Sequence, residues 1–230
     1  MHSNFIFNDH SELKDRHALF SPSQSSWLRY DDEKIADRVR NQYRTALGTE
    51  IHDFAASQID LNHKVTSVKE LIREIENYIY CKYKYLSGDS TVSEYARKMI
   101  FRLSELPKEV FEAVKFYIND GIGFKMNTEQ GLKYSEHIFG HADTICFRDN
   151  TLRIHDLKTG ANPAHIEQLE TYAALFCLEY QIKPGTINIQ LRLYQWDGIV
   201  THNPSVEDIV EIMDRIVSSE EIAQQVEKEG

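Results

Sequence analysis

Residues 140–172 constrain the fold more than any other part of the chain. Ala142–Phe147 and Leu152–Leu157 are short segments with strand character, and residues 148–150 form a tight turn between them. An amphipathic helix follows at His165–Tyr180. Two strands joined by a tight turn and followed by a helix predict a sheet in which the helix crosses over to a further strand.

The segments that flank this unit supply further strands. Thr186–Trp196 alternates apolar and polar side chains, as a half-buried strand does. Asp197-Gly198 then predicts a tight turn into a partner strand at Ile199–His202. Another strand is predicted at Leu132–Phe139. The predicted fold class is therefore α/β, with a mixed sheet flanked by helices.

The first half of the chain is predicted to be mainly helical. Apolar residues at three- and four-residue steps predict helices over Lys34–Ile59, Val68–Tyr80 and Val92–Asn119, and Pro107 is able to split the last of these. A length of 230 residues with 41% apolar side chains predicts one well-buried domain. Its parts are a helical N-terminal region (1–120), the sheet with its crossover helix (121–204) and an acidic C-terminal helix (205–230).

The charge of the chain limits how it can bind nucleic acid. The formal net charge is −10, whereas a protein that binds DNA by electrostatics alone is basic. Much of the acid is concentrated in residues 205–230, which contain eight acidic residues and only two basic ones. Any contact with nucleic acid therefore depends on a local basic patch or on metal ions, and the C-terminal helix is not expected to touch DNA.

Cysteine usage and hydropathy exclude several classes of protein. The three cysteines, Cys81, Cys146 and Cys177, are far apart and form no C-x-x-C pair, which argues against a zinc ribbon and an iron–sulfur cluster. A scattered, odd set also fits a reducing compartment. The N-terminal residues lack the features of a signal peptide, and no run of about 18 apolar residues exists. We expect a cytoplasmic protein with no membrane partner, in the host cytoplasm if its gene is viral.

Asp143, Asp156 and Lys158 form the main candidate site. Alternation along the strand places Asp156 and Lys158 on one side and turns Leu157 into the core. Asp143 lies on the preceding strand, so a hairpin can bring it beside Asp156. Two carboxylates with the carbonyl of Leu157 suit Mg²⁺ or Mn²⁺, and a lysine beside them can orient a water molecule. The competing interpretation of Asp-x-Lys alone is a solvated ion pair.

Three other residues resemble a metal site less well. His137, His141 and Cys146 could be taken for a zinc set, but their spacing fits no standard zinc site. We interpret them as strand residues that line the cleft.

Glu136 is a further carboxylate close in sequence to Asp143. By strand alternation its side chain lies on the opposite face of the sheet from that of Asp143. Sharing a site with Asp143 would require a bulge near Gly140, which leaves its role as an additional ligand open.

Four short motifs occur in a fixed order along the chain. They are Gly48-Thr49-Glu50-Ile51-His52, Gly140-His141-Ala142-Asp143, Asp156-Leu157-Lys158-Thr159-Gly160 and Gln168-Leu169-Glu170-Thr171-Tyr172. In this order they resemble the PD-(D/E)xK nuclease superfamily, and specifically its RecB-like exonuclease branch, which includes viral recombination exonucleases and CRISPR-adaptation nucleases. The resemblance covers roughly residues 48–172. It implies a restriction-endonuclease-like core with an N-terminal helical region.

The resemblance implies a role for each matching residue. His52 would join the metal ligands from the N-terminal helix, with Asp143 and Asp156 as the metal carboxylates and Lys158 as the catalytic lysine. Gln168 and Tyr172 lie four residues apart on one helix face and would contact the DNA backbone. Branch members with an iron–sulfur cluster carry four cysteines near the core, and this chain does not, so no such cluster is expected. A phosphate-binding loop is also missing from the sequence, so we do not expect a fused helicase motor.

Basic residues on the first predicted helix are candidates for phosphate contacts. Arg38, Arg40 and Arg44 lie within a short stretch before His52. They could grip DNA phosphates, or they could form an ordinary solvated helix face. Sequence alone does not decide between these two interpretations.

The expected function is therefore a Mg²⁺- or Mn²⁺-dependent DNA exonuclease that leaves 5′-phosphates. The resemblance suggests a role in viral recombination or DNA degradation, with double-stranded DNA bearing a free end as substrate. Some members of this branch form a ring around DNA, so this chain could also form a homo-oligomer. A single-strand annealing protein or another recombination protein is a candidate partner. Two alternatives remain: a structure-specific or restriction-like endonuclease, and a non-catalytic nucleic-acid-binding module that retains the fold.

Overall fold

The computed structural model describes residues 18–86, 90–160 and 165–229. The chain divides into two compact units, Met1–Thr45 and Ala46–Gly230. The described part of the first unit contains the 3₁₀ segment η2 (Pro22–Arg29) and the beginning of helix α1 (Asp32–Asp60). Ser21 caps η2 by accepting the N–H of Ser23, and the indole of Trp27 donates to the Ser21 carbonyl at 3.0 Å.

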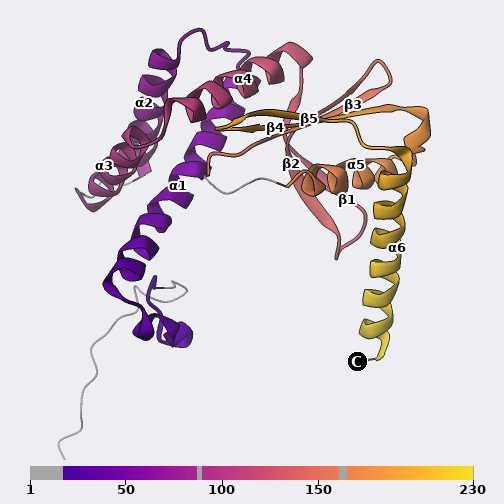
Figure 1. Ribbon diagram of the computed structural model, residues 1–230, viewed down its shortest axis with the longest axis horizontal. Helices are drawn as coiled ribbons and strands as arrows, with labels where there is room; N and C mark the ends of the chain where they lie inside the picture. Colours follow the sequence, from indigo (N-terminus) through magenta and orange to yellow (C-terminus); the bar gives the residue numbers. More distant parts are fainter. Residues whose placement is uncertain (1–17, 87–89, 161–164, 230) are drawn as a thin grey trace, which may run out of the picture. The chain divides into compact units, whose positions relative to one another are not determined.

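The second unit is an α/β arrangement with a five-stranded mixed sheet (Figure 1). Its elements in chain order after α1 are α2 (Val68–Leu86), α3 (Ser90–Ser104), α4 (Lys108–Phe124), β1 (Asn127–Lys133), β2 (Phe139–Arg148), β3 (Thr151–Leu157), α5 (Glu167–Glu179), η3 (Pro184–Thr186), β4 (Asn188–Gln195), β5 (Gly198–His202) and α6 (Val206–Glu229). The strand order is β1-β2-β3-β4-β5. All neighbours are antiparallel except β3 and β4, which are parallel and are joined through α5. The predicted crossover is confirmed.

The turn between β2 and β3 fixes the register that matters for the site. Asp149 and Asn150 have φ values of 50° and 56°, as both central residues of a type I′ hairpin do, and Asp and Asn tolerate this region. Arg148 therefore pairs with Thr151, and the ladder runs on to the pair Thr144 and His155.

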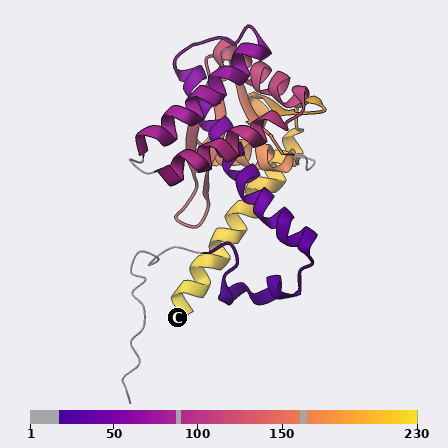
Figure 2. The same cartoon turned by 90° about the vertical axis from the view of Figure 1, so that its left-hand side faces the viewer.

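Helices cover both faces of the sheet (Figure 1). On one face α5 packs over the apolar side chains of β3 and β4, such as Leu152, Ile154 and Leu191, and α6 packs against α5, so that all four elements share one buried cluster. On the other face α4 contributes Tyr117, whose ring meets Tyr194 of β4 at 5.5 Å between centroids. Burial of this apolar surface is the main stabilising contribution to the unit. Figure 2 shows α2 and α3 running beside one another, and α2 also packs against α4.

The first strand differs from the sequence prediction, whereas the predicted break at Pro107 is confirmed. The strand predicted at Leu132–Phe139 begins earlier, at Asn127, and ends at Lys133, because residues 134–138 form the tip of the β1–β2 hairpin. The hydroxyl of Ser135 accepts the N–H groups of His137 and Ile138, which competes with strand pairing there. The helical stretch predicted over residues 92–119 is split as Pro107 suggested, since α3 ends at Ser104 and α4 begins at Lys108.

Candidate active site

Asp143 and Asp156 lie where β2 and β3 stop pairing. The last pair of the ladder is Thr144 with His155, so one further step of the same register sets Asp143 opposite Asp156. Instead of a backbone bond, the carboxylate Oδ2 of Asp143 accepts the N–H of Leu157 at 3.1 Å. Leu157 itself is buried, as predicted. Two like charges directly opposite one another on neighbouring strands repel, so this arrangement costs stability without a cation.

Asp156 is a buried carboxylate whose two oxygens have unequal partners. Its side chain is only 5% exposed. The ammonium of Lys158 donates to Oδ1 at 3.0 Å and also approaches Oδ2 to 2.9 Å, but Oδ2 receives no hydrogen bond of acceptable geometry from any described residue. Burial, followed by the charge of Asp143, raises the pKa of Asp156 to about 6. A buried carboxylate oxygen without a donor is unfavourable unless something else binds it.

His52 reaches Asp143 from helix α1. Its Nδ1 lies 3.3 Å from Oδ2 of Asp143, and its side chain is 27% exposed. Burial lowers the pKa of His52, but its hydrogen bond to Asp143 and the charges of Asp143 and Asp156 outweigh burial and raise the pKa above its usual value. The structure therefore brings together the histidine of the first motif and both predicted carboxylates.

A buried ion pair anchors this part of α1 to helix α2. Glu50, two residues before His52, is 4% exposed. It accepts hydrogen bonds from the ammonium of Lys82 at 2.7 Å and from the hydroxyl of Tyr83 at 2.8 Å. Lys82 also bonds Asp53 at 2.8 Å. The lysine and tyrosine of α2 therefore fix the turn of α1 that carries His52, a role that periodicity alone did not reveal.

Lys158 and Gln168 form the next contact between motifs. The ammonium of Lys158 donates to Oε1 of Gln168 at 3.1 Å, in addition to Asp156. A lysine ammonium has three N–H donors. With two acceptors among the described residues, one donor is left for a water molecule or a phosphate oxygen.

Two glycines allow close packing between the motifs. A Cβ at Gly140 would lie 2.9 Å from Cε1 of Tyr172, so the ring of Tyr172 packs directly against the backbone there. A Cβ at Gly48 would lie 3.1 Å from Oγ1 of Thr159. Only glycine permits such an approach at Gly140 without a shift of the ring. Each of the four motifs therefore contacts another of the four.

Glu129 is a third carboxylate beside the site, and the sequence analysis missed it. Thr128 pairs with Thr144 and Gln130 pairs with Ala142, which sets Glu129 opposite Asp143. Glu129 has a left-handed φ of 48°, uncommon for a non-glycine residue inside a strand. Burial and then the charge of Asp143 raise its pKa. Its position depends on the pairing of β1 with β2, which the wrongly predicted strand at 132–139 concealed.

Other candidate residues lie elsewhere. Glu136, whose role the sequence left open, lies at the hairpin tip, where it is 86% exposed and paired with Lys133. His137 bonds Glu220 and Glu227 of α6. No group of three His, Cys, Asp or Glu side chains within the described ranges is arranged as a ready metal-binding cluster.

The predicted phosphate-contacting arginines belong to the first unit. Arg38 donates from Nε to the Leu19 carbonyl at 3.0 Å and from Nη2 to Gln24 at 3.2 Å. Arg44 donates to Asn41 at 3.3 Å. These contacts are local to that unit and leave the question of a phosphate contact open.

The residues present suit a hard divalent cation even though they are not preassembled around one. Asp143 and Asp156 offer carboxylate oxygens, His52 offers an imidazole, and the backbone of Leu157 adjoins Asp143. The Oδ2 atom of Asp156 has an unused lone pair at a buried position. In this structure the Lys158 ammonium stands beside Asp156 and supplies positive charge there. The donor types match those that Mg²⁺ and Mn²⁺ prefer.

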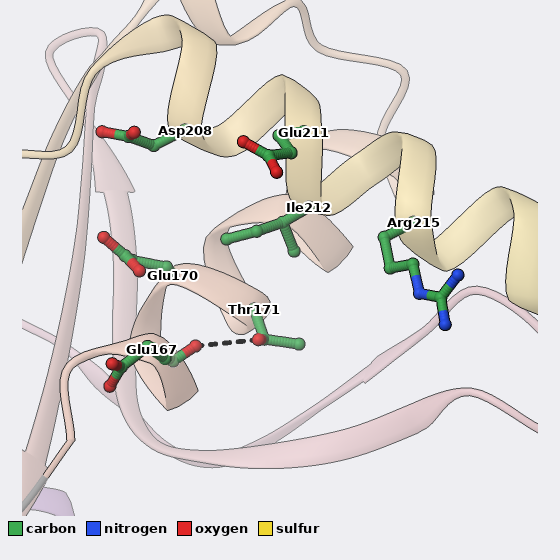
Figure 3. A pocket seen from close by; sticks show the side chains of 7 residues that line it. All are labelled: Glu167, Glu170, Thr171, Asp208, Glu211, Ile212 and Arg215. Atoms are coloured by element: carbon green, nitrogen blue, oxygen red, sulfur yellow. Dashed lines mark hydrogen bonds between the residues drawn. The ribbon is translucent and has the colours of Figure 1, made fainter.

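A separate hollow lies between α5 and α6 (Figure 3). It has a volume of about 460 Å³. Its lining residues are Glu167, Glu170, Thr171, Asp208, Glu211, Ile212 and Arg215. Four carboxylates against one arginine give it a negative potential that repels a phosphate backbone. Its lining contains none of His52, Asp143, Asp156 and Lys158, so it is distinct from the candidate site.

Comparison with known proteins identifies the family. The chain belongs to the family described as Protein of unknown function (DUF2800), which matches residues 17–224. No curated protein matches the chain. A solved structure described as "Crystal structure of SSO0001" is similar over 73% of this chain and 84% of its own chain, at 12% sequence identity and a TM-score of 0.29. That TM-score is too low to establish a shared fold.

Membership in the DUF2800 family assigns no activity, so the chemistry rests on the side chains described above. In the described part of the chain, no helix is both long and apolar enough to cross a lipid bilayer.

Proposed function

We propose that this protein is a Mg²⁺- or Mn²⁺-dependent DNA nuclease of the PD-(D/E)xK type, and that it acts as an exonuclease on DNA ends. One observation carries the proposal: four motifs spread over residues 48–172, the first of them far from the other three in sequence, are joined by direct contacts. His52 contacts Asp143, Lys158 contacts Gln168, and Tyr172 packs on Gly140. The order of these motifs supplies the resemblance, and their convergence is what such a site requires.

The cation and the chain have separate tasks in this proposal. A bound Mg²⁺ or Mn²⁺ would supply Lewis acidity, lowering the pKa of a water molecule and neutralising charge on a phosphodiester. Asp143, Asp156 and His52, with the carbonyl of Leu157, would hold the cation. The Oδ2 atom of Asp156 is buried and accepts no hydrogen bond of acceptable geometry from the described residues, so it could serve as one of these ligands.

Lys158 is the residue of the chain that would assist the attack of water on the phosphodiester. Its ammonium donates to Asp156 and Gln168, so its remaining N–H would be available to the substrate phosphate or the attacking water. The water oxygen forms a bond to phosphorus while the bond from phosphorus to the 3′-oxygen breaks. The water proton passes to solvent, the leaving oxygen gains a proton, and the product keeps a 5′-phosphate.

The test compares linear with covalently closed double-stranded DNA in the presence of Mg²⁺. We expect the wild-type protein to degrade linear DNA only, and Lys158→Ala to abolish the reaction. Cleavage of closed circular DNA as well would show that the protein is an endonuclease, with the same residues at its site. Unchanged cleavage by Lys158→Ala would contradict the assignment of the site.

A matched control separates loss of chemistry from loss of folding. Lys108→Ala removes a lysine from α4 that is 72% exposed and 3.6 Å from Glu112. It should cleave as the wild-type protein does. Failure of the wild-type protein and of the variants to cleave double-stranded and single-stranded DNA, with Mg²⁺ and with Mn²⁺, would favour the alternative of a non-catalytic nucleic-acid-binding module.

A further inference from the structure

A second charged feature lies on the opposite face of the sheet from Asp156. Arg153 of β3 and Arg192 of β4 both place their guanidinium groups against the ring of Phe124, at 4.8 Å and 5.0 Å from its centroid. Both also donate to the same oxygen, Oε1 of Gln190, at 3.3 Å and 3.4 Å. Two cations therefore share one aromatic ring and one acceptor.

The positive charge here is only partly neutralised. Arg192 pairs with Asp120 of α4 at 2.8 Å, but its Nε is buried without an acceptor among the described residues. Arg153 has no carboxylate partner among them. Two guanidinium groups with one carboxylate leave a site of net positive charge.

The surface beside the pair is polar and partly exposed. Alternation and register place Arg148, Thr151, Asn188 and Thr201 on the same face as the two arginines. Arg148, Asn188 and Thr201 are exposed. The positions of β2, β3 and β4 on this face carry no carboxylate from Thr144 through Arg148, Thr151 through His155, and Asn188 through Tyr194. We call this surface, formed by Arg148, Arg153, Gln190 and Arg192, the arginine face.

We propose that the arginine face binds phosphate groups of a nucleic-acid backbone. Guanidinium groups match phosphate oxygens geometrically, and stacking on Phe124 holds them in place before a ligand arrives. The strip of polar side chains runs along several strands, which suits an extended polyanion better than a small phosphate ester. Because Asp156 points to the other face, this contact is separate from the candidate active site. It relies on the proposed function only for the choice of nucleic acid as the polyanion.

The test measures binding of a fluorescein-labelled 20-base-pair DNA duplex in EDTA, where no metal-dependent cleavage occurs, over a range of salt concentrations. Arg153→Gln should weaken binding and reduce the slope of log affinity against log salt by about one, as expected for the loss of one phosphate contact. Arg153→Lys keeps the charge and should restore the slope. Arg73→Gln, on an exposed position of α2, makes the same change of charge and should behave as the wild-type protein does.

Each outcome has a defined meaning. A slope for Arg153→Gln equal to that of Arg73→Gln, with both proteins folded by circular dichroism, would overturn the proposal. So would competition by millimolar inorganic phosphate at constant ionic strength that displaces the duplex fully, since a small anion would then be the ligand. A salt-slope change at Arg153 without any Mg²⁺-dependent cleavage would support the arginine face while rejecting the nuclease. Mg²⁺-dependent cleavage by the wild-type protein, together with an unchanged salt slope for Arg153→Gln, would support the nuclease and reject the arginine face.

Discussion

The carboxylate of Asp143 accepts the backbone N–H of Leu157 at 3.1 Å, and this bond bridges β2 and β3 just beyond their last ladder pair. It holds Asp143 in place although the register sets Asp156 opposite it. The bond also keeps the backbone of Leu157 at the site, where its carbonyl was predicted to be a ligand. A single side chain thus takes over where strand pairing stops and positions two carboxylates that repel one another.

Replacing Asp156 by Asn should stabilise the protein in the absence of metal ions. The raised pKa of Asp156, about 6, means that burial and Asp143 disfavour its charge more than Lys158 favours it. An uncharged amide of the same shape removes that cost. We expect a rise in Tm of about 2–6 °C in EDTA, measured by calorimetry. A lower Tm for Asp156→Asn would mean that the bond to Lys158 outweighs the repulsion.

Gly140→Ala should destabilise the protein through Tyr172. The added Cβ would lie 2.9 Å from the ring, so either the ring or β2 has to move. We expect a loss of about 1–3 kcal/mol in the free energy of unfolding, measured with urea. Adding Tyr172→Ala to Gly140→Ala should remove most of the effect of the glycine substitution. Gly123→Ala, where a Cβ meets nothing within 4 Å in helix α4, should be neutral or stabilising.

Lys82→Met should destabilise the protein by leaving the buried Glu50 with one donor fewer. The Lys82 side chain is 30% exposed and that of Glu50 is 5% exposed, so the cost is larger than for a surface pair. We expect about 1–3 kcal/mol in the free energy of unfolding. Lys108→Met, which breaks an exposed pair with Glu112, should cost less than about 0.5 kcal/mol. Equal effects of the two substitutions would show that Lys82 does not anchor α1.

The contact between the β1–β2 hairpin and α6 should weaken as the pH rises. Hydrogen bonds to Glu227 and Glu220 raise the pKa of His137 above its usual value, and Ser135 bonds the same Glu220. Because the pKa of His137 is higher in the folded than in the unfolded state, its protonation stabilises the folded state. This stabilisation is fully present below about pH 6.5 and is lost as the pH rises past the pKa of the folded state.

The measurement is the difference in Tm between the wild-type protein and His137→Gln at several pH values from 5.5 to 8.5. This difference should shrink with rising pH. His165→Gln changes a histidine that is 82% exposed and should show no comparable trend. A difference for His137→Gln that stays constant with pH would indicate that its charge plays no part in holding α6.

Sequence patterns predicted most of the fold because the local signals were strong. Asp149-Asn150 and Asp197-Gly198 marked the two hairpins, and Pro107 marked the break between α3 and α4. The beginning of β1 was missed because Asn127–Gly131 lacks the alternating apolar pattern of a strand, and only pairing with β2 makes it one.

The candidate site was also predictable only in part, because some of its residues meet only through long-range pairing. Asp143, Asp156 and Lys158 follow from strand register and motif spacing, which are local. Glu129 approaches Asp143 only through long-range pairing, and its left-handed backbone leaves no sequence signal. The clamp of Lys82 and Tyr83 on Glu50 joins residues more than thirty positions apart, so helical periodicity could not reveal it.

Binding of Mn²⁺ measured by calorimetry tests the central claim most directly, because it does not depend on the choice of substrate. The wild-type protein should bind the ion, and Asp143→Asn and Asp156→Asn should each weaken binding at least about tenfold. Glu136→Gln removes a carboxylate at the hairpin tip and should bind as the wild-type protein does. Equal Mn²⁺ affinity in all four proteins would contradict the claim that Asp143 and Asp156 form a cation site.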